Sequence, residues 1–214
     1  MMFVFIPYWN ESTKGFKESL ANQTIPFDGD LNTNRIVWRN RRRDKIYWTK
    51  TCNDFYKQIQ LYRGIKDDDV ICIMNNDISF ESDFFEKGSK VKRGQVLVPT
   101  GIRIDWSKKG FHSGGLDCFS GRAFFMTYRD FIDSKGFCRL LPHYLSDLEF
   151  GIRQLKKLKL IEMDSKIIHK PHPKTTGFKM LSEDNPIFWT IFLLKAGRNR
   201  YLPLNILKAW YDVI

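Results

Sequence analysis

Two uninterrupted apolar runs, each followed at once by polar residues, place the strongest constraint on the fold. Met2–Ile6 (MFVFI) runs into Pro7, and Val70–Met74 (VICIM) runs into Asn75. A strand with no polar residue on either face is typical of a sheet that helices cover on both sides, as they do in parallel sheets. The two runs therefore predict central strands of an α/β protein.

Segments with helical periodicity lie between these strands and further predicted ones. The helices are expected at 10–20, 52–62 (with Gly64 as the stop) and 147–158, and the additional strands at 35–38, Gln95–Val98 and 167–168. Strands that alternate with helices predict an α/β sandwich with a largely parallel sheet. Because ligands bind beyond the carboxyl ends of such strands, the polar residues that follow them are expected to share one rim.

The length of 214 residues, with 43% apolar and 15% aromatic residues, fits one packed domain. No linker-like segment divides it. We expect a main domain over 1–181 and a C-terminal extension over 182–214, with helices at Pro186–Ala196 and 203–211. These two segments are apolar, aromatic and basic, and they predict helices packed on the same domain. The alternative is peripheral contact with a membrane surface.

The charge balance points to an anionic partner. Lys and Arg number 35 and Asp and Glu 24, a net charge of +11, which attracts nucleotide phosphates, lipid headgroups or nucleic acid alike. The four cysteines form no C-x-x-C pair, which is typical of reduced thiols in a cytoplasmic protein. The apolar N-terminal run is too short for a signal peptide and is expected to be the first strand.

Asn75, Asn76 and Asp77 follow the predicted strand Val70–Met74 and place a carboxylate at its end. A hard divalent cation often takes only one or two protein carboxylates and leaves its other positions to substrate phosphates and water. Asn and Asp are also common turn residues, so a plain turn is the competing interpretation.

A second acidic cluster opens the predicted helix 147–158. Ser146 and Glu149 have the spacing of a capping box, which leaves Asp147 free in the first turn. The helix dipole would favour the ionised form of Asp147 there, and an ionised carboxylate in a cleft can act as a general base. The alternative is an acidic residue that only complements the dipole.

Histidines follow the predicted strand at 167–168. His169 or His172 could join a metal ion, and an imidazole ligand would shift the preference from Mg2+ towards Mn2+. The alternative is a polar loop residue.

The order and spacing of five segments resemble those of inverting family 2 glycosyltransferases of the GT-A fold. The segments are Ile6-Pro7-Tyr8-Trp9-Asn10-Glu11, Ile73-Met74-Asn75-Asn76-Asp77, residues 119–126, Asp147-Leu148-Glu149 with Arg153, and His169. The first is similar to the family's opening strand and loop, the second to its D-x-D-type metal motif, and the fourth to its E-D-x-D…R segment. The resemblance spans roughly residues 2 to 172.

The resemblance implies a three-layer, Rossmann-like sandwich and a transfer of sugar from a nucleotide diphosphate sugar to a hydroxyl acceptor. It implies a nucleotide near Pro7, Tyr8, Asn10, Glu11, Asn75 and Asn76, a Mn2+ or Mg2+ ion on Asp77 and His169, and Asp147 as the catalytic base. The acceptor would be a saccharide or a lipid-linked saccharide. A role for Gly114, Gly115 and Asp117 in positioning is a further possibility.

The sequence also departs from the family. Ser146 replaces the usual Glu before the base, 38–41 lacks the acidic residue expected after the second strand, and Q-x-x-R-W, the motif of processive synthases, is absent. Two alternatives stay open. One is a sugar-nucleotide-binding protein without catalysis. The other is a nucleic-acid-binding protein, because basic and aromatic residues interleave over 35–50.

Overall fold

The structure is a computed structural model that describes residues 1–7, 13–24, 35–39, 48–143, 145–169 and 186–202. Its centre is a six-stranded sheet in the order β2-β1-β3-β8-β5-β9. The strands are β1 (Met2–Ile6), β2 (Arg35–Arg39), β3 (Val70–Met74), β5 (Gln95–Val98), β8 (Ala123–Thr127) and β9 (Lys159–Glu162).

Strand β8 is the one member of this sheet that runs against its neighbours. It pairs antiparallel with β3 and β5, whereas β1 pairs parallel with β2 and β3, and β5 parallel with β9. The prediction of a mainly parallel α/β sheet is confirmed. The antiparallel insertion matters for the site, because it brings the segment before β8 to the end of β3.

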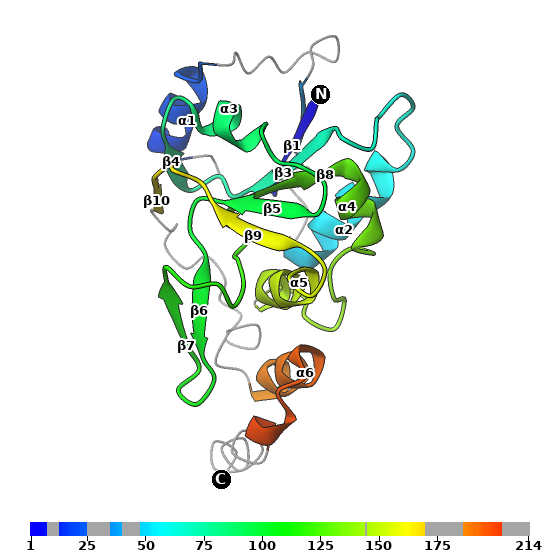
Figure 1. The fold of residues 1–214 in the computed structure, drawn as a ribbon, viewed down its shortest axis with the longest axis vertical. Helices are drawn as coiled ribbons and strands as arrows, with labels where there is room; N and C mark the ends of the chain where they lie inside the picture. Colours follow the sequence, from blue (N-terminus) through cyan, green and yellow to red (C-terminus); the bar gives the residue numbers. More distant parts are fainter. Residues whose placement is uncertain (8–12, 25–34, 40–47, 144, 170–185, 203–214) are drawn as a thin grey trace.

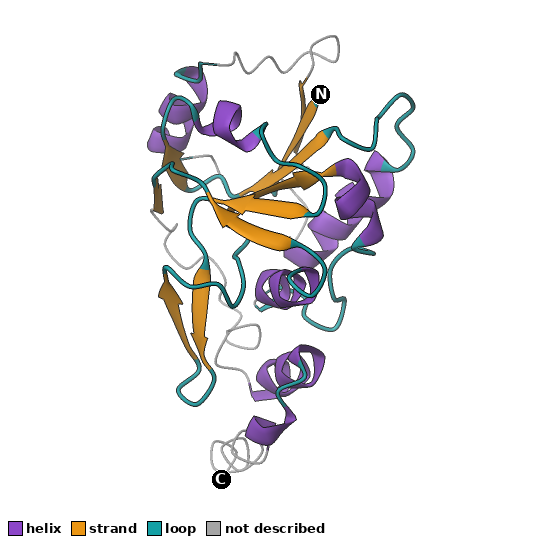
Figure 2. Ribbon diagram, in the orientation of Figure 1, coloured by secondary structure: helices purple, strands orange, loops and turns teal. Residues whose placement is uncertain are grey.

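Helices cover both faces of the sheet, which makes three layers (Figures 1 and 2). On one face lie α1 (Lys14–Ala21) and α3 (Phe84–Gly88), and on the other lie α2 (Trp48–Ile59), α4 (Tyr128–Asp133) and α5 (Ser146–Gln154). All five residues of β1 and of β3 are buried, as their uninterrupted apolar runs predict, and so are all five residues of β8.

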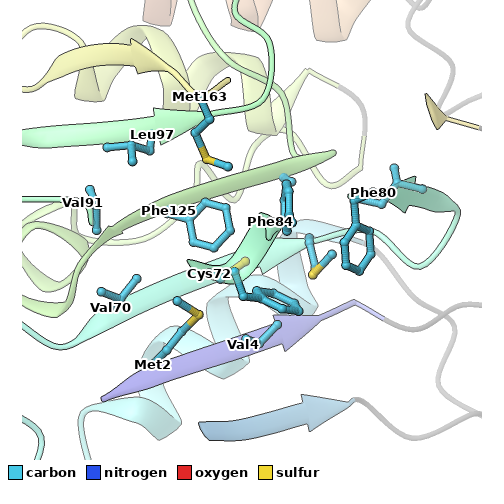
Figure 3. Close-up of a cluster of buried hydrophobic side chains, with 14 of the residues drawn as sticks. Met2, Val4, Val70, Cys72, Phe80, Phe84, Val91, Leu97, Phe125 and Met163 are labelled. Atoms are coloured by element: carbon cyan, nitrogen blue, oxygen red, sulfur yellow. The ribbon is translucent and has the colours of Figure 1, made fainter. Parts of the chain in front are cut away.

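Alternate residues of each central strand feed two separate cores. Met2 and Val4 of β1 join Phe84 and Phe125 beneath α1 and α3, the cluster drawn in Figure 3. The intervening residues of the same strands face α2, α4 and α5, where Phe5 stacks on Phe55 with ring centroids 4.5 Å apart. The sheet is therefore held from both sides, and its carboxyl rim is rigidly placed.

Two small antiparallel pairs lie outside the central sheet. β4 (Ile78–Phe80) pairs with β10 (Ile167–His169), and β6 (Ile102–Asp105) pairs with β7 (Gly110–Ser113). The β6–β7 hairpin, β4, β9, α3 and α4 were not predicted from the sequence. Their individual strands and helices have six residues or fewer and lack the uninterrupted apolar runs that mark β1 and β3.

A third core lies between the β6–β7 hairpin, α5 and α6 (Pro186–Ala196). Trp189 of α6 is 1% exposed and stacks on Phe111 of β7 at 5.8 Å, and Phe192 stacks on Trp106 at 5.7 Å. A short 3-10 helix, Asn199–Tyr201, follows. The predicted helix at 203–211 lies outside the described residues. Among the helices that the structure describes, none combines the length and the apolarity needed to cross a membrane.

Three predicted boundaries are wrong. Helix α1 begins at Lys14 rather than at residue 10, because Thr13 caps it by accepting a hydrogen bond from Phe16 N–H. Helix α2 ends at Ile59, before Gly64. Helix α5 ends at Gln154 rather than at 158, because the Gln154 carbonyl accepts hydrogen bonds from the N–H groups of two following residues in a turn. All four cysteines are free thiols.

Candidate active site

The carboxyl ends of β1 and β3 lie side by side and define the rim of the site. Pro7 directly follows β1 and is buried, and Asn75 directly follows β3. The N–H of Asn75 donates to the carbonyl of Arg122 at 2.9 Å. This bond continues the β3–β8 ladder, in which Met74 pairs with Ala123, by one residue beyond the strands. The rim therefore joins the 75–77 segment to the 120–122 segment.

Asp77 and His169 meet at this rim although 92 positions separate them. Strand β10 pairs antiparallel with β4 so that His169 lies opposite Ile78, the residue after Asp77. His169 Nε2 is 3.1 Å from Asp77 Oδ2. Asp77 is 14% exposed and His169 26%, so both are sheltered but accessible.

The other carboxylate oxygen of Asp77 has no partner. Asp77 Oδ1 is buried and makes no hydrogen bond among the described residues, a situation that costs free energy unless another group satisfies the atom. Adjacent ligands of an octahedral ion with bonds of about 2.1 Å lie roughly 3.0 Å apart, close to the Asp77–His169 separation. A carboxylate with one orphaned oxygen, and with an imidazole nitrogen 3.1 Å from its other oxygen, is a donor set that fits a divalent cation.

Asp77 and His169 supply two potential ligands for such an ion. Within the described part of the chain, no group of three or more His, Cys, Asp or Glu residues is arranged to hold a metal. The remaining coordination positions would fall to phosphate oxygens and water, as is usual for Mg2+ in nucleotide sites. His172 lies outside the described residues.

Asp147 stands in the first turn of α5, and a backbone N–H across the rim holds it. Gly121 N–H donates to Asp147 Oδ2 at 2.8 Å. Helix α5 comes close enough for this bond because Gly151 lacks a side chain. A Cβ at that position would lie 2.8 Å from the carbonyl oxygen of Phe119. The 119–121 segment and α5 therefore pack backbone to backbone.

The predicted capping box at Ser146 and Glu149 is wrong. The N-cap of α5 is Leu145, in the left-handed conformation with φ 66°, and no side chain caps the helix. Ser146 is buried, and its hydroxyl oxygen has no hydrogen-bond partner among the residues that the structure describes. Glu149 instead accepts from Arg153 Nε at 2.9 Å, because residues four apart on a helix face each other. Arg153 also donates to the carbonyl of Gly136 at 2.7 Å and so fixes the segment before α5.

The pKa of the Asp147 carboxyl is raised above its usual value, chiefly by burial. The N–H groups of Gly121, Leu148 and Asp147 itself oppose this shift by stabilising the ionised form, and so does the positive charge of Arg122. The expected preference for the ionised form is therefore present locally but is outweighed by desolvation.

The thiols next to Asp147 are poor nucleophiles. Burial, followed by the charge of Asp147, raises the pKa of both Cys52 and Cys118. Neither supplies a thiolate near neutral pH. This leaves the carboxylate as the basic group at this end of α5.

A short series of backbone contacts connects the two carboxylates. The carboxylate of Asp147 accepts a hydrogen bond from Gly121 N–H. Arg122 follows Gly121, and its carbonyl accepts a hydrogen bond from Asn75 N–H, two residues before Asp77. Asp77 and Asp147 are thus attached to adjoining segments of one rim, although 70 positions separate them in the sequence.

The other residues singled out in the sequence differ in their placement. Asn75 is half-buried, and its side-chain oxygen accepts a hydrogen bond from Trp48 Nε1 at 3.3 Å. Asn76 is 5% exposed, and its carbonyl accepts from Thr13 N–H at the start of α1. Tyr8, Asn10, Glu11 and the basic segment 40–47 lie outside the described residues.

Gly114, Gly115 and Asp117 have structural roles at the β6–β7 hairpin. Asp117 Oδ2 accepts from Ile104 N–H at 2.8 Å. A Cβ on Gly115 would meet the backbone of Arg103, only 2.4 Å from its nitrogen. These residues hold the hairpin against the loop that follows it.

Comparison with protein-family models gives no match, and comparison with curated protein sequences gives none either. Solved structures do match. The crystal structure of GalNAc-T7 with UDP, GalNAc and Mn2+ superposes on 99% of this chain with a TM-score of 0.61 and 13% identity. A mannosyltransferase from Pyrobaculum calidifontis, in complex with GDP-Man and Mn2+, superposes on 98% with a TM-score of 0.55 and 12% identity.

The chain has the GT-A glycosyltransferase fold. It spans 57% of the GalNAc-T7 chain and 69% of the mannosyltransferase chain. At these identities the likeness concerns the arrangement of the backbone. In this GT-A fold, the rim that carries Asp77, His169 and Asp147 is the edge at which ligands of open α/β sheets bind.

Sequence reasoning missed Trp48 and Gly121, two residues that connect parts of this GT-A rim. Trp48 donates to Asn75, and Gly121 donates to Asp147. Nothing in the spacing of the sequence distinguishes Trp48 from the other aromatic residues of 35–62. Gly121 lies in a Ser-Gly pair that the family resemblance covers, but its backbone role follows only from the tertiary structure.

Proposed function

We propose that this chain is a metal-dependent glycosyltransferase that moves a sugar from a nucleotide diphosphate sugar to a hydroxyl acceptor with inversion. The observations that support the proposal are the contact of His169 with Asp77, which has an oxygen unpartnered among the described residues, and the position of Asp147 on an adjoining segment at the carboxyl edge of a GT-A sheet. The two matching structures are complexes with UDP and with GDP-Man, which is consistent with a nucleotide sugar donor.

Asp77 and His169 would hold the divalent ion, Mn2+ or Mg2+. Such an ion offsets the negative charge that develops on a leaving nucleoside diphosphate. In this assignment the distance of 3.1 Å between His169 Nε2 and Asp77 Oδ2 is the spacing of two neighbouring ligands. Asn75 and Asn76, which precede Asp77 in the sequence, would lie near such an ion. Pro7, Tyr8, Asn10 and Glu11 are proposed to contact the nucleotide, as the family resemblance implies.

Asp147 is the proposed general base. A hydroxyl of the acceptor gives its proton to the carboxylate as its oxygen forms a bond to the anomeric carbon, and the bond from that carbon to the diphosphate oxygen breaks. A pKa above the usual carboxyl value suits this role, because it makes the ionised group a stronger proton acceptor. Gly121 N–H keeps the carboxylate oriented throughout.

The proposed function extends to the class of acceptor and to the number of sugars added. The acceptor is a saccharide or a lipid-linked saccharide, and a single addition rather than a processive polymerisation is proposed. Glycan or polysaccharide synthesis at the cytoplasmic side, in solution or peripherally at a membrane, is the corresponding setting.

The test is donor binding and donor hydrolysis by the purified protein, since many transferases pass their sugar slowly to water. UDP-, GDP- and dTDP-sugars are screened by thermal shift with Mn2+ or Mg2+, and a donor at about a hundredfold excess over its dissociation constant should stabilise by about 2.7 kcal/mol. The best donor is then followed for release of the nucleoside diphosphate.

Asp77→Asn is the informative variant and Asp133→Asn the matched control. Asp133 is an exposed partner of Arg129 on α4. We expect Asp77→Asn to abolish the stabilisation that depends on the metal, and Asp133→Asn to preserve it. Donor binding without any hydrolysis would favour the sugar-nucleotide-binding alternative. Salt-sensitive binding to plain oligonucleotides without donor binding would favour the nucleic-acid alternative and overturn the proposal.

A further inference from the structure

Trp48 begins helix α2, and three hydrogen bonds from Trp48 and Thr49 hold the start of this helix against the segment before α5. Trp48 N–H donates to His143 Nδ1 at 3.2 Å. Thr49 N–H donates to the carbonyl of Pro142 at 3.2 Å, and the Thr49 hydroxyl donates to the carbonyl of Leu141 at 2.5 Å. The point from which the indole projects is therefore set by the same segment that leads into Asp147.

The indole reaches both halves of the candidate active site. Its Nε1–H donates to Asn75 Oδ1 at 3.3 Å. Its six-membered ring covers Gly121 so closely that a Cβ there would lie 2.4 Å from Cζ2. Phe137 supports the indole edge-on, with ring centroids 5.0 Å apart. One side chain thus contacts the residue two positions from Asp77 and the residue whose N–H holds Asp147.

The hydrogen bond from the Trp48 indole also determines the orientation of the Asn75 side-chain amide. An indole nitrogen can only donate, so its partner must be the amide oxygen. The amide nitrogen of Asn75 then points elsewhere, and it makes no hydrogen bond with any described residue. Asn75 is half-buried at the end of β3, so part of the residue is accessible at the rim. The natural partner of its NH2 group there is an anionic oxygen of a diphosphate.

We propose that Trp48 is a positioning residue of the transfer reaction. Its N–H orients Asn75 so that the amide NH2 faces the donor diphosphate, and its ring holds Gly121 so that the backbone N–H stays on Asp147. This role rests on the proposed function. Groups held in place before the substrate arrives need no reorganisation in the transition state, which is where such a residue contributes.

Two substitutions separate the two contacts. Trp48→Phe keeps an aromatic ring at Gly121 but removes the N–H, so Asn75 is free to turn its oxygen towards the diphosphate. We expect the KM for the donor to rise roughly threefold to tenfold, the factor that one ordinary hydrogen bond contributes, with the pH profile unchanged. Trp48→Ala removes the ring from Gly121 as well. In this variant we expect kcat to fall in addition to the rise in the donor KM, and the acid limb of the kcat profile to move.

Trp189→Phe is the matched control, because Trp189 is buried in the third core on α6 rather than at the rim. A purely structural role for Trp48 predicts that all three variants lose activity only in proportion to their loss of thermal stability. That result, or an unchanged donor KM in Trp48→Phe, would overturn the proposal.

A measurement without turnover separates this inference from the proposed function. The chain has six tryptophans, and their indole N–H signals can be followed by 15N-labelled NMR, with Trp48 assigned from the Trp48→Phe spectrum. Mn2+ should broaden the Trp48 signal and spare that of Trp189. If the wild type turns over no sugar nucleotide but this broadening occurs, the proposed function fails while the link from Trp48 to the metal motif holds. If the wild type is active and the Trp48 signal is unaffected by Mn2+, the positioning role fails alone.

Discussion

Asp147 experiences opposing electrostatic effects at the end of α5. Burial raises its pKa, while three backbone N–H groups and Arg122 favour its charged form. A carboxylate that is costly to ionise yet well oriented is a better proton acceptor than an exposed one. The same desolvation makes the ionised group unfavourable for the stability of the folded protein.

Replacement of Asp147 by Asn should therefore separate activity from stability. We expect transfer to fall roughly 10²–10⁴-fold, the usual contribution of a general base, while donor binding is retained. The carboxyl with a raised folded-state pKa contributes stability below its unfolded-state pKa of about 3.9 and loses that contribution as the pH rises through the folded value. At pH 7 the uncharged Asn should leave the melting temperature unchanged or higher. A clear loss of stability, or unchanged turnover, would contradict the assignment.

The dependence of wild-type kcat on pH should also report the ionisation of Asp147. Because the base acts only when ionised, kcat should decline on acidification through the folded-state pKa of Asp147, which burial raises above its usual value. A profile measured with saturating donor checks this. An acid limb below pH 4 would argue against Asp147 as the base.

His143, which contacts the start of α2, should make the stability of the protein depend on pH. Its Nδ1 accepts from Trp48 N–H, and burial lowers its pKa. A lowered folded-state pKa gives stability that is complete above the unfolded value of about 6.5 and is lost as the pH falls through the folded value. We expect the wild-type free energy of unfolding to decrease from pH 7 to pH 5 more steeply than that of His143→Gln, as measured in urea. Equal slopes would refute this, and His112→Gln, on an exposed ring of β7, is the control.

Among the secondary-structure elements, α5 owes its position to close backbone packing at Gly151, which has no side chain, and not to a side-chain cap. Its N-cap is Leu145, whose side chain makes no capping hydrogen bond, and the position of the helix depends on the contact of Gly151 with the Phe119 backbone. Arg153, which bonds Glu149 and two preceding carbonyls, secures the other end. Asp147 reaches Gly121 because the helix approaches this closely.

Gly151→Ala should be destabilising although alanine is the better helix former. An exposed substitution of this kind would stabilise by about 1 kcal/mol, but here the new Cβ meets backbone atoms that cannot rotate away, and overpacking costs about 1–3 kcal/mol. Thermal unfolding gives the sign. Gly15→Ala in α1 is the matched control, because the obstacle there is the Ser79 hydroxyl, which can rotate. A stabilised Gly151→Ala protein would show that α5 is free to move.

At the scale of the whole molecule, the β6–β7 hairpin, α5 and α6 share one core that extends the GT-A sandwich. Its stacked pairs join the C-terminal helix to the hairpin, as Figure 1 shows at the end of the molecule away from β1. Helix α6 also leaves Ile187 and Leu194 exposed, at 65% and 53%. The packed side of α6 is thus part of the fold, and its open side is not needed for that packing.

Trp189→Ala should accordingly destabilise the protein by about 3–5 kcal/mol, the range for removal of a buried large aromatic side chain. Ile187→Ala, on the exposed side of the same helix, should stay within about 0.5 kcal/mol of the wild type. Chemical denaturation measures both. Equal effects would mean that α6 does not pack on the hairpin in solution.

The sequence by itself determined the sandwich and its central strands. The runs Met2–Ile6 and Val70–Met74 can be satisfied only between two layers, and the carboxyl ends of such strands must carry the polar residues. It also pointed to Asp77, His169 and Asp147, through residue types and order. Short elements such as β4 and the β6–β7 hairpin could not be predicted, because a few residues carry no readable period.

Only the tertiary structure decided which of these side chains work together. The pairing of β10 with β4 brings His169 to Asp77, and the antiparallel entry of β8 brings Gly121 to Asp147. Trp48 then bridges the two. Such contacts depend on backbone registers and on the space left by missing side chains. Neither is encoded in local spacing, because the partners are separated by 26 to 92 positions and meet only when the core has formed.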